Sequence, residues 1–483
     1  MKRGAMVPLV SYVDGEYVGD HLGGPGTHDR ENPADVAEVV STARWADPAI
    51  AEHAVASARA ASSSWQATPA PVRGDVLRRC ADLLEQRTAA IAQDMAREQG
   101  KTVPEAAGEV GRSVAILRYF AAQTLAPDGS SYPSHQAGTR LFSRRIPVGV
   151  VSAITPWNFP LAIPVWKIAP ALAYGNTVVW KPSEVVPLTS TALLAAFIDA
   201  GLPGGVLHML LGGGAGLGPA LYDVDAVTFT GSTSVGREVV LPAAVASGAQ
   251  VQLELGGKNV AVVLADADLD LAVAQVARGA FLSAGQKCTA TSLVLAQESI
   301  RAELAARLSA WAAAAVVGDP RASATEIGPL ATAAQLERYE SFLDPAAHGG
   351  TVIAGGRGPA GGHFARPAVI CDADPHSRAS RDEIFAPIAV LEPVADLSDA
   401  LRRANETHFG LTASIFTSEL AAAYRFIDEI ETGIVKVNQE SAGLEFHVPF
   451  GGIKDSGYGP AEQGLAAQEF YTRSKTVYLT HAG

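Results

Sequence analysis

Cysteine is scarce in this chain of 483 residues, and its distribution excludes two kinds of site. Cys80, Cys288 and Cys371 are odd in number and far apart, so they do not form a disulfide framework. None belongs to a CxxC pair, and the eleven histidines are widely spaced. We therefore predict no metal site, because zinc ligands usually cluster at short spacing. The predicted compartment is a reducing cytosol.

Positive charge is also in deficit. Lys and Arg number 37 against 50 Asp and Glu, a formal net charge of −13. No global positive field attracts phosphates, so nucleic acids and membranes are not expected partners. The long uncharged stretch 146–166 contains Pro147, Pro156, Pro160 and Pro164, too many breaks for a membrane-spanning helix. The basic N-terminus is followed by too short an apolar run for a secretory signal.

The remaining composition, 48% hydrophobic and 18% charged, is ordinary for a globular protein. Residues 47–123 have the three- and four-residue apolar spacing of helices. Strands then alternate with helices over residues 148–280 and again over 290–437, which predicts two α/β domains with parallel sheets. Residues 140–145 and 472–478 alternate like further strands.

Cys288 is the cysteine whose surroundings suggest chemistry. It lies in SAGQKCT (283–289), where small residues let the backbone approach a ligand. The neighbouring Lys287 would lower the pKa of the thiol and favour the nucleophilic thiolate. The alternative is a buried, inert cysteine, which is the preferred interpretation for Cys80 and Cys371.

Glu254 and Asn158 are polar residues in apolar surroundings. Glu254 lies between leucines at a strand end, where an apolar setting would raise its pKa toward that of a general base. The alternative is a surface carboxylate paired with Lys258. Asn158 lies in the loop TPWNFP (155–160) and would donate to a developing oxyanion. Alternatively, it caps a helix begun at Pro160.

Three further segments suggest a phosphate or ribose site. FTGSTSVG (229–236) follows a strand and opens a helix, so its backbone amides would hold a pyrophosphate. GGGAGLG (212–218) is glycine-rich, but neither run has the GxGxxG spacing, and both suit ordinary turns. Lys181 and Glu184 follow a strand, where α/β proteins bind ligands; the alternative is a solvated charge pair.

Together these motifs resemble the aldehyde dehydrogenase superfamily over nearly the whole chain. Glu254 and Cys288 stand 34 positions apart, as the family pattern expects. The motifs, in order, are 156–160, 181–184, 229–236, 254–258, 285–288, EIFAP (383–387) and PFGG (449–452).

The resemblance implies a mechanism. Cys288 would attack the aldehyde carbon, and Asn158 with the Cys288 backbone N–H would hold the oxyanion. After hydride transfer, Glu254 would activate water to release the acid. Lys167 and Glu462 match positions that relay the proton.

The resemblance also implies a bound NAD, with NADP as the alternative. Glu184 would repel a 2′-phosphate, which favours NAD. The implied cofactor contacts are Thr155, Pro156, Trp157, Lys181, Ser183, Glu184, Gly214, Phe229, Gly231, Ser232, Val235, Leu255, Glu383 and Phe385.

Within the superfamily, LSAGQKCTATS (282–292) looks most like α-ketoglutaric semialdehyde (2,5-dioxovalerate) dehydrogenases. An acidic substrate needs a cation, for which Lys287, Arg112 and Arg118 are candidates. For each arginine the alternative is an ordinary exposed helix charge.

Other functions remain open. Trp166, Phe281 and Phe446 would suit a dehydrogenase of aliphatic or aromatic aldehydes. A non-catalytic protein of the same fold is disfavoured by the complete set of Cys288, Glu254 and Asn158. A CoA-acylating member is disfavoured because Glu254 suits hydrolysis by water.

The implied fold has two Rossmann-related α/β domains and a small β bridge. The cofactor domain would comprise residues 1–125 and 147–256, the catalytic domain 257–455, and the oligomerisation bridge 126–146 and 470–483. Family members pair through this bridge, so we expect a homodimer or homotetramer that acts on a small-molecule aldehyde.

Overall fold

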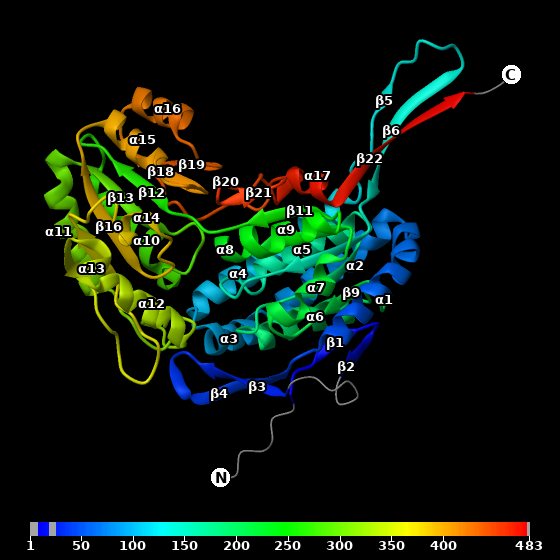
Figure 1. Ribbon diagram of the computed structural model, residues 1–483, viewed down its shortest axis with the longest axis horizontal. Helices are drawn as coiled ribbons and strands as arrows, with labels where there is room; N and C mark the ends of the chain where they lie inside the picture. Colours follow the sequence, from blue (N-terminus) through cyan, green and yellow to red (C-terminus); the bar gives the residue numbers. More distant parts are fainter. Residues whose placement is uncertain (1–7, 19–25, 481–483) are drawn as a thin grey trace, which may run out of the picture.

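The computed structural model describes residues 8–18 and 26–480. The parts of the predicted domains that fall on residues 1–7, 19–25 and 481–483 lie outside the described residues. The chain forms two lobes, each built on one large sheet, and a thin arm that projects away from both (Figure 1).

The first lobe contains an eight-stranded sheet. Its five central strands are parallel, and the flanking strands at both edges are antiparallel. In spatial order the strands are β2 (Glu16–Val18), β1 (Ser11–Val13), β9 (Leu207–Met209), β8 (Thr177–Lys181), β7 (Val150–Ile154), β10 (Ala226–Thr230), β11 (Gln250–Glu254) and β21 (Gly457–Tyr458). The strand order reverses at β7 and β10, and ligands of parallel sheets bind outside such a reversal.

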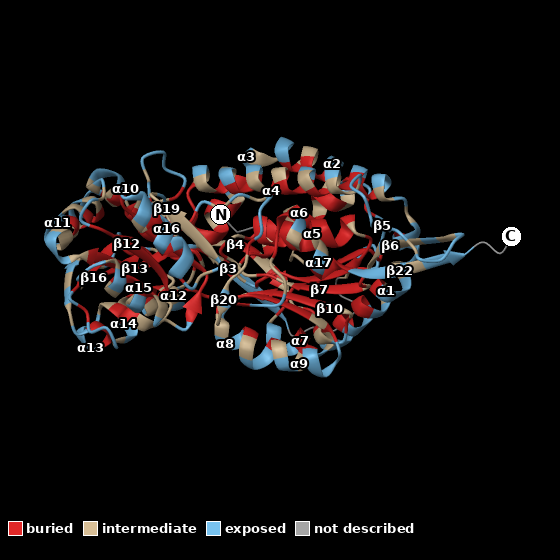
Figure 2. Cartoon of the chain, turned by 90° about the horizontal axis from the view of Figure 1, so that it is seen from above, coloured by how far each residue is buried: buried red, intermediate tan, exposed pale blue. Residues whose placement is uncertain are grey.

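Successive apolar side chains along the strands point to opposite faces of this sheet, and both faces are buried. Val151 and Val178 belong to one core cluster, whereas their neighbours Val150 and Val179 belong to another. Figure 2 shows helices on both sides of the sheet. The first side carries α2 (Ala70–Gln86), α3 (Thr88–Gln99), α4 (Val103–Gln123), α5 (Ala162–Ala173) and α6 (Pro187–Asp199). The other carries α1 (Pro48–Ala67), α7 (Gly214–Tyr222), α8 (Thr233–Val235) and α9 (Leu241–Ala246).

The second lobe contains a seven-stranded sheet with its own core. In spatial order the strands are β14 (Thr351–Ala354), β15 (Ala368–Cys371), β16 (Ile388–Val394), β13 (Thr291–Gln297), β12 (Asn259–Val263), β18 (Thr412–Phe416) and β19 (Ile434–Val437). Its helices are α10 (Leu269–Phe281), α11 (Glu298–Ala314), α12 (Ala333–Leu343), α13 (Pro345–His348), α14 (Arg378–Arg381), α15 (Leu397–Asn405) and α16 (Leu420–Glu429).

The arm is a three-stranded antiparallel sheet. β22 (Thr472–Thr480) pairs with β6 (Thr139–Pro147) along its whole length, and β5 (Ser131–Tyr132) pairs with the other edge of β6. The short helix α17 (Ala467–Tyr471) leads from the body of the protein into β22. Two segments far apart in the sequence therefore build one projection.

The predicted fold class, two α/β sheets and a small β unit, is confirmed. The predicted strands and helices of residues 148–280 agree with the structure to within a few residues, whereas the predicted helical stretch 47–123 is divided into four helices, α1 to α4. The prediction lacked β1, β2 and the hairpin of β3 (Thr27–Asn32) and β4 (Asp35–Arg44). β3 reads THDREN, which lacks apolar alternation, so its sequence carries no strand signal.

Among the helices of residues 8–18 and 26–480, none combines the length and the apolar character needed to span a membrane.

Candidate active site

A cavity of about 830 Å³ lies where the two lobes face each other. The carboxyl ends of β7, β8, β10 and β11 supply one wall, and residues of the second lobe supply the other. All fourteen predicted cofactor contacts line this cavity, together with Cys288 and Asn158. The structure therefore brings the motifs of both lobes to one place.

Cys288 reaches the cavity through an unusual turn. Ser283, Ala284 and Gly285 all have left-handed backbones, with φ of 56°, 51° and 66°. A Cβ at Gly285 would lie 2.3 Å from the carbonyl oxygen of Ala386, so glycine is required there. The turn packs closely on the second lobe and directs the half-buried Cys288 toward the cavity.

The expected activation of Cys288 by Lys287 is wrong for this structure. Burial and the carboxylates of Glu254 and Glu383 raise the pKa of the Cys288 thiol to about 12. The Lys287 side chain turns away, and its Nζ donates to the carbonyl of Arg278 at 3.2 Å. Adjacency along the chain did not predict the direction of the side chain.

Asn158 faces the nucleophile segment. Its Nδ2 donates to the carbonyl oxygen of Gln286 at 3.1 Å, two residues before Cys288. The helix α5 begins at Ala162 with no side-chain cap, so the alternative of a capping asparagine is wrong. The buried amide is thus positioned at the junction of the two lobes.

Glu254 is buried at the end of β11, so the alternative of a surface carboxylate is wrong. Its Oε2 has no hydrogen-bond partner within the described part of the chain. Burial and the nearby charge of Glu462 raise the pKa of Glu254 well above its usual value, as the sequence predicted, while Lys167 opposes this shift. The result is a carboxyl group suited to proton transfer.

Lys167 and Glu462 form a buried ion pair behind the cavity wall, and Lys167 Nζ also donates to Thr228 Oγ1 at 2.8 Å. Glu462 Oε2 lacks a partner among residues 8–18 and 26–480. Electrostatic coupling links this pair to Glu254, so the three predicted groups do come together.

The cavity wall suits a dinucleotide. At one end, Lys181 Nζ lies 3.6 Å from the carboxylate of the half-exposed Glu184, and either group can meet a ribose hydroxyl. Glu383 accepts from the backbone N–H of Gly257 at 3.3 Å, and a Cβ at Gly256 would fall 2.5 Å from it. Phe385 packs edge-on against Trp157 near Cys288, an apolar surface for a flat ring.

Sequence reasoning missed several residues of the site. Gln335, Arg338, Asp382, His408 and Phe409 line the cavity from the second lobe. These residues were not singled out in the sequence motifs, and only the packing of the two lobes brings them to the cavity. Lys101, Glu105 and Glu109, charged residues behind Asn158, were missed for the same reason.

The candidate substrate cations differ in their burial and in their hydrogen-bond partners. Arg112 is half-buried, donates to the carbonyl of Leu444, and keeps an Nε without a partner in the described residues. Arg112 does not line the cavity, but it lies within electrostatic range of Cys288 and, more strongly, of Glu109 and Glu445. Arg118 is exposed and paired with Glu85, which agrees with the alternative of an ordinary exposed helix charge.

Phe281 is fully buried against Trp311 and is absent from the cavity wall, so its expected place in an apolar tunnel is wrong.

A model of the aldehyde dehydrogenase family matches residues 23–477. The chain belongs to the aldehyde dehydrogenase family. As a member of that family it is an oxidoreductase that acts on the aldehyde group.

The relatives of this aldehyde dehydrogenase include enzymes with different named substrates. An α-ketoglutaric semialdehyde dehydrogenase of Bacillus subtilis is 41% identical, covering 97% of this chain and 98% of its own. A betaine aldehyde dehydrogenase of Rhizobium leguminosarum is 36% identical, covering 97% and 96%. A solved betaine aldehyde dehydrogenase of Staphylococcus aureus in complex with NAD⁺ superposes with a TM-score of 0.93 at 33% identity, covering 97% of this chain and 94% of that one.

Proposed function

We propose that this aldehyde dehydrogenase oxidises an ω-semialdehyde of a carboxylic acid, 2,5-dioxovalerate in particular, to the dicarboxylic acid with NAD. The observation that carries the substrate class is Arg112, a half-buried cation within electrostatic range of Cys288 whose Nε has no partner among the described residues. The named activity of the Bacillus subtilis relative supports the same class.

The surroundings of Arg112 favour an anionic substrate with several acceptor oxygens. Arg112 Nη2 lies 3.4 Å from Gln463 Oε1, and Gln463 Nε2 has no partner among the residues described. A buried donor without an acceptor costs about 1–3 kcal/mol, which a substrate oxygen would recover. Betaine aldehyde carries a cation instead, and Arg112 would repel it.

In the proposed mechanism, Cys288 Sγ loses its proton and adds to the aldehyde carbon, forming a thiohemiacetal. Asn158 Nδ2 and the Cys288 N–H would then donate to the oxygen, which becomes negative as the C=O double bond opens. Because the thiol pKa is high in the free protein, substrate addition needs a base, and the carboxylate of Glu254 is near enough to act electrostatically on Cys288.

When bound, NAD would supply the hydride acceptor that converts the thiohemiacetal to a thioester. Glu254 would next take a proton from water, the hydroxyl would add to the thioester carbon, and the C–S bond would break to release the acid. The raised pKa of Glu254 lets it hold this proton, and Lys167 and Glu462 would pass it onward.

The cofactor contacts divide by chemistry. Lys181 and Glu184 would bind the adenosine ribose, with Glu184 disfavouring a 2′-phosphate. The backbone at Ser232 would meet the pyrophosphate, and Glu383 and Phe385 would meet the nicotinamide ribose and ring. Thr155, Pro156, Trp157, Ser183, Gly214, Phe229, Gly231, Val235 and Leu255 would complete the wall.

We also propose the predicted domain organisation: a cofactor domain of residues 1–125 and 147–256, a catalytic domain of 257–455, and a bridge of 126–146 and 470–483. The bridge would join subunits into a homodimer or homotetramer. The proposed compartment is the cytosol, on the scarcity of cysteine alone.

The test is the rate of NADH appearance with 2,5-dioxovalerate, succinate semialdehyde, hexanal, benzaldehyde and betaine aldehyde at equal concentration. We expect the highest kcat/KM with 2,5-dioxovalerate and no turnover by a Cys288→Ala variant. A preference for hexanal or betaine aldehyde would keep the chemistry and overturn the substrate class.

The Arg112→Gln variant separates the role of this cation from general effects. It should raise KM for the two acidic substrates by about tenfold to a hundredfold, because a charged pair is lost, and leave KM for hexanal unchanged. Arg118→Gln is the matched control, an arginine on the same helix whose guanidinium is exposed. Equal KM values for Arg112→Gln and the parent enzyme would rule out the assigned contact.

A further inference from the structure

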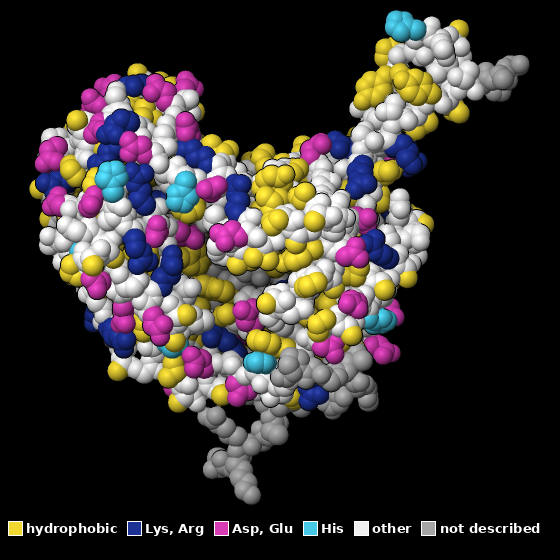
Figure 3. Space-filling view, viewed as in Figure 1, with side chains coloured by type: hydrophobic (Ala, Val, Ile, Leu, Met, Phe, Trp, Pro, Cys, Tyr) yellow, Lys and Arg dark blue, Asp and Glu magenta, His cyan; other side chains and the backbone are white. Residues whose placement is uncertain are grey.

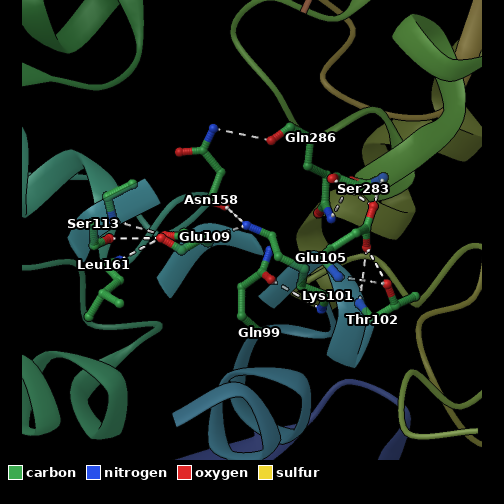
Figure 4. Close-up of polar contacts among 11 residues, drawn as sticks. Gln99, Lys101, Thr102, Glu105, Glu109, Ser113, Asn158, Leu161, Ser283 and Gln286 are labelled. Carbon is green, nitrogen blue, oxygen red and sulfur yellow. Dashed lines mark hydrogen bonds and ion pairs between the residues drawn. The ribbon is translucent and has the colours of Figure 1, made fainter. Parts of the chain in front are cut away.

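The oxyanion loop and the nucleophile loop come from different lobes, and both contact one short stretch at the start of α4 (Figure 4). The oxyanion loop carries Asn158, and the nucleophile loop runs from Ser283 to Cys288. The stretch comprises Lys101, Glu105 and Glu109, none of which lines the cavity. Their charges are therefore unexplained by contact with a ligand.

Lys101 and Glu109 form a buried ion pair. Lys101 Nζ lies 2.5 Å from Glu109 Oε2, and each side chain is 1% exposed. The same Nζ donates to the carbonyl oxygen of Asn158 at 3.0 Å and stands 4.0 Å from the centre of the Phe159 ring. Lys101 thus contacts the backbone of the residue that supplies the oxyanion donor.

Glu109 holds the other side of the same loop. Its Oε1 accepts from the backbone N–H groups of Leu161 and Ala162 at 2.9 and 3.0 Å. The loop is therefore fixed at residue 158 by a cation and at residues 161–162 by an anion. With the backbone fixed in this way, the Asn158 side chain points toward Gln286 and donates to its carbonyl oxygen.

Glu105 binds the nucleophile loop from the same helix turn. Its Oε1 accepts from the N–H and Oγ of Ser283 at 2.8 and 2.9 Å. Its Oε2 accepts from the N–H of Thr102 at 3.0 Å and completes a capping box at the start of α4. The helix start is thus joined to both loops at once.

We propose that Lys101 and Glu109 are positioning residues that aim the amide of Asn158 at the oxygen bound on Cys288. A buried ion pair is a poor source of stability, because desolvation of both charges offsets their attraction. Here the side-chain hydrogen bonds of the pair, besides the one between its members, go to the carbonyl of Asn158 and to the N–H groups of Leu161 and Ala162, where the oxyanion loop enters α5. The inference rests on the proposed function, which assigns the oxyanion to Asn158.

A double-mutant cycle tests this coupling. Lys101→Met combined with Glu109→Gln removes both charges together, so no unpaired charge stays buried. In the parent enzyme this pair of changes should lower kcat about tenfold or more, since losing an oxyanion donor outright costs about 10²–10³. In an Asn158→Ala background it should lower kcat less than twofold, with KM for NAD within twofold in both.

The matched control is Arg403→Met with Glu392→Gln, a second buried ion pair, which lies in the other lobe between α15 and β16. It should leave kcat within twofold of the parent. Circular dichroism and thermal unfolding check the fold of each variant. If the neutral pair does not fold, Lys101→Arg, which keeps the charge but changes its shape, enters the same cycle.

The outcomes separate the inference from its foundation. An equal loss of kcat in both backgrounds, or no loss in the parent, would show that the pair supports the fold alone and would overturn the inference. If Asn158→Ala keeps the parent kcat, the oxyanion assignment itself falls and takes the inference with it. A loss of kcat that occurs in the parent enzyme and not in the Asn158→Ala background supports the inference.

Discussion

At the scale of single residues, the thiol of Cys288 has the most directly measurable property. Its pKa of about 12 in the free protein means that the thiolate fraction grows with pH well beyond neutrality. Alkylation by iodoacetamide should therefore accelerate about tenfold per pH unit from pH 7 to 9 without a plateau. A plateau near pH 8 would contradict the buried, anion-flanked environment.

Glu383→Gln makes this prediction specific. The pKa of Glu383 is raised to about 7 by burial, so the group is ionised at pH 9 and opposes the thiolate. Removing its charge should lower the thiol pKa and speed alkylation on the order of threefold at pH 9. Cys288→Ala gives the background from Cys80 and Cys371, both buried.

Cofactor choice depends on another single carboxylate. Glu184 is half-exposed beside Lys181, at the proposed ribose site. Glu184→Gln should raise kcat/KM with NADP about tenfold relative to NAD, because a repulsion with the 2′-phosphate disappears. Equal ratios in the parent and the variant, measured from NADPH and NADH absorbance, would place the selectivity elsewhere.

The sequence indicated the site residues that lie in motifs, but it did not indicate the residues that contact these motifs from outside the cavity. The neighbours of Cys288, Asn158 and Glu254 along the chain made them candidates with open alternatives, and the family resemblance of the motifs assigned their roles. Lys101 was not, because its contact with Asn158 joins residues 57 positions apart. The Lys287 prediction failed for a related reason: side-chain direction depends on the turn at 283–285, which only the packed structure defines.

At the scale of elements, α6 illustrates how one helix stabilises the start of another. Val186 precedes α6 and offers no side-chain cap. Glu98 on α3 accepts instead from the N–H groups of Leu188 and Thr189 at 2.6 and 2.8 Å. Complete burial nevertheless raises the pKa of Glu98 to about 7. The cap therefore depends on pH.

The sign of that dependence follows from linkage. The pKa of Glu98 is higher in the folded than in the unfolded state, so the folded protein binds the proton more tightly. The associated stability is present below the unfolded pKa, about 4.5, and is lost as pH rises to about 7. The loss amounts to about 3 kcal/mol, the value of this pKa difference in free energy.

Glu98→Gln removes this titration. The melting temperature of the Glu98→Gln variant, relative to that of the parent, should rise between pH 5 and pH 8, because only the parent loses stability over this range. Glu52→Gln, an exposed change on α1, gives the baseline. A difference that stays constant across this pH range would mean that Glu98 keeps an ordinary pKa despite its burial.

Strand boundaries were predictable where burial is regular, because strands such as β7 and β12 are buried on both faces and read as apolar runs. The helical character of α2 and α4 was predictable from their three- to four-residue repeat, but the boundaries between the helices were not. The hairpin of β3 and β4 was not predictable. Its contacts are polar and distant, as when Arg30 donates to the carbonyls of Glu98 and Ala331.

At the scale of the whole molecule, the arm leaves large apolar side chains exposed. Tyr478 is 73% exposed, Leu479 56% and Tyr132 49%, and Figure 3 shows apolar side chains gathered on the arm. A three-stranded sheet has too little material for a core of its own, and exposed apolar groups of this kind mark contact surfaces. The proposed use of the arm to join subunits follows from these features.

Charged substitutions on the arm test that proposal. Tyr478→Glu with Leu479→Glu should lower the native mass measured by light scattering, because burying the two carboxylates at a subunit contact is costly. Ser474→Glu is the control, since it adds a charge to the same strand at an exposed polar position. If the double variant keeps the parent mass, the arm is not the contact that joins subunits, and the apolar surface of β22 requires another explanation.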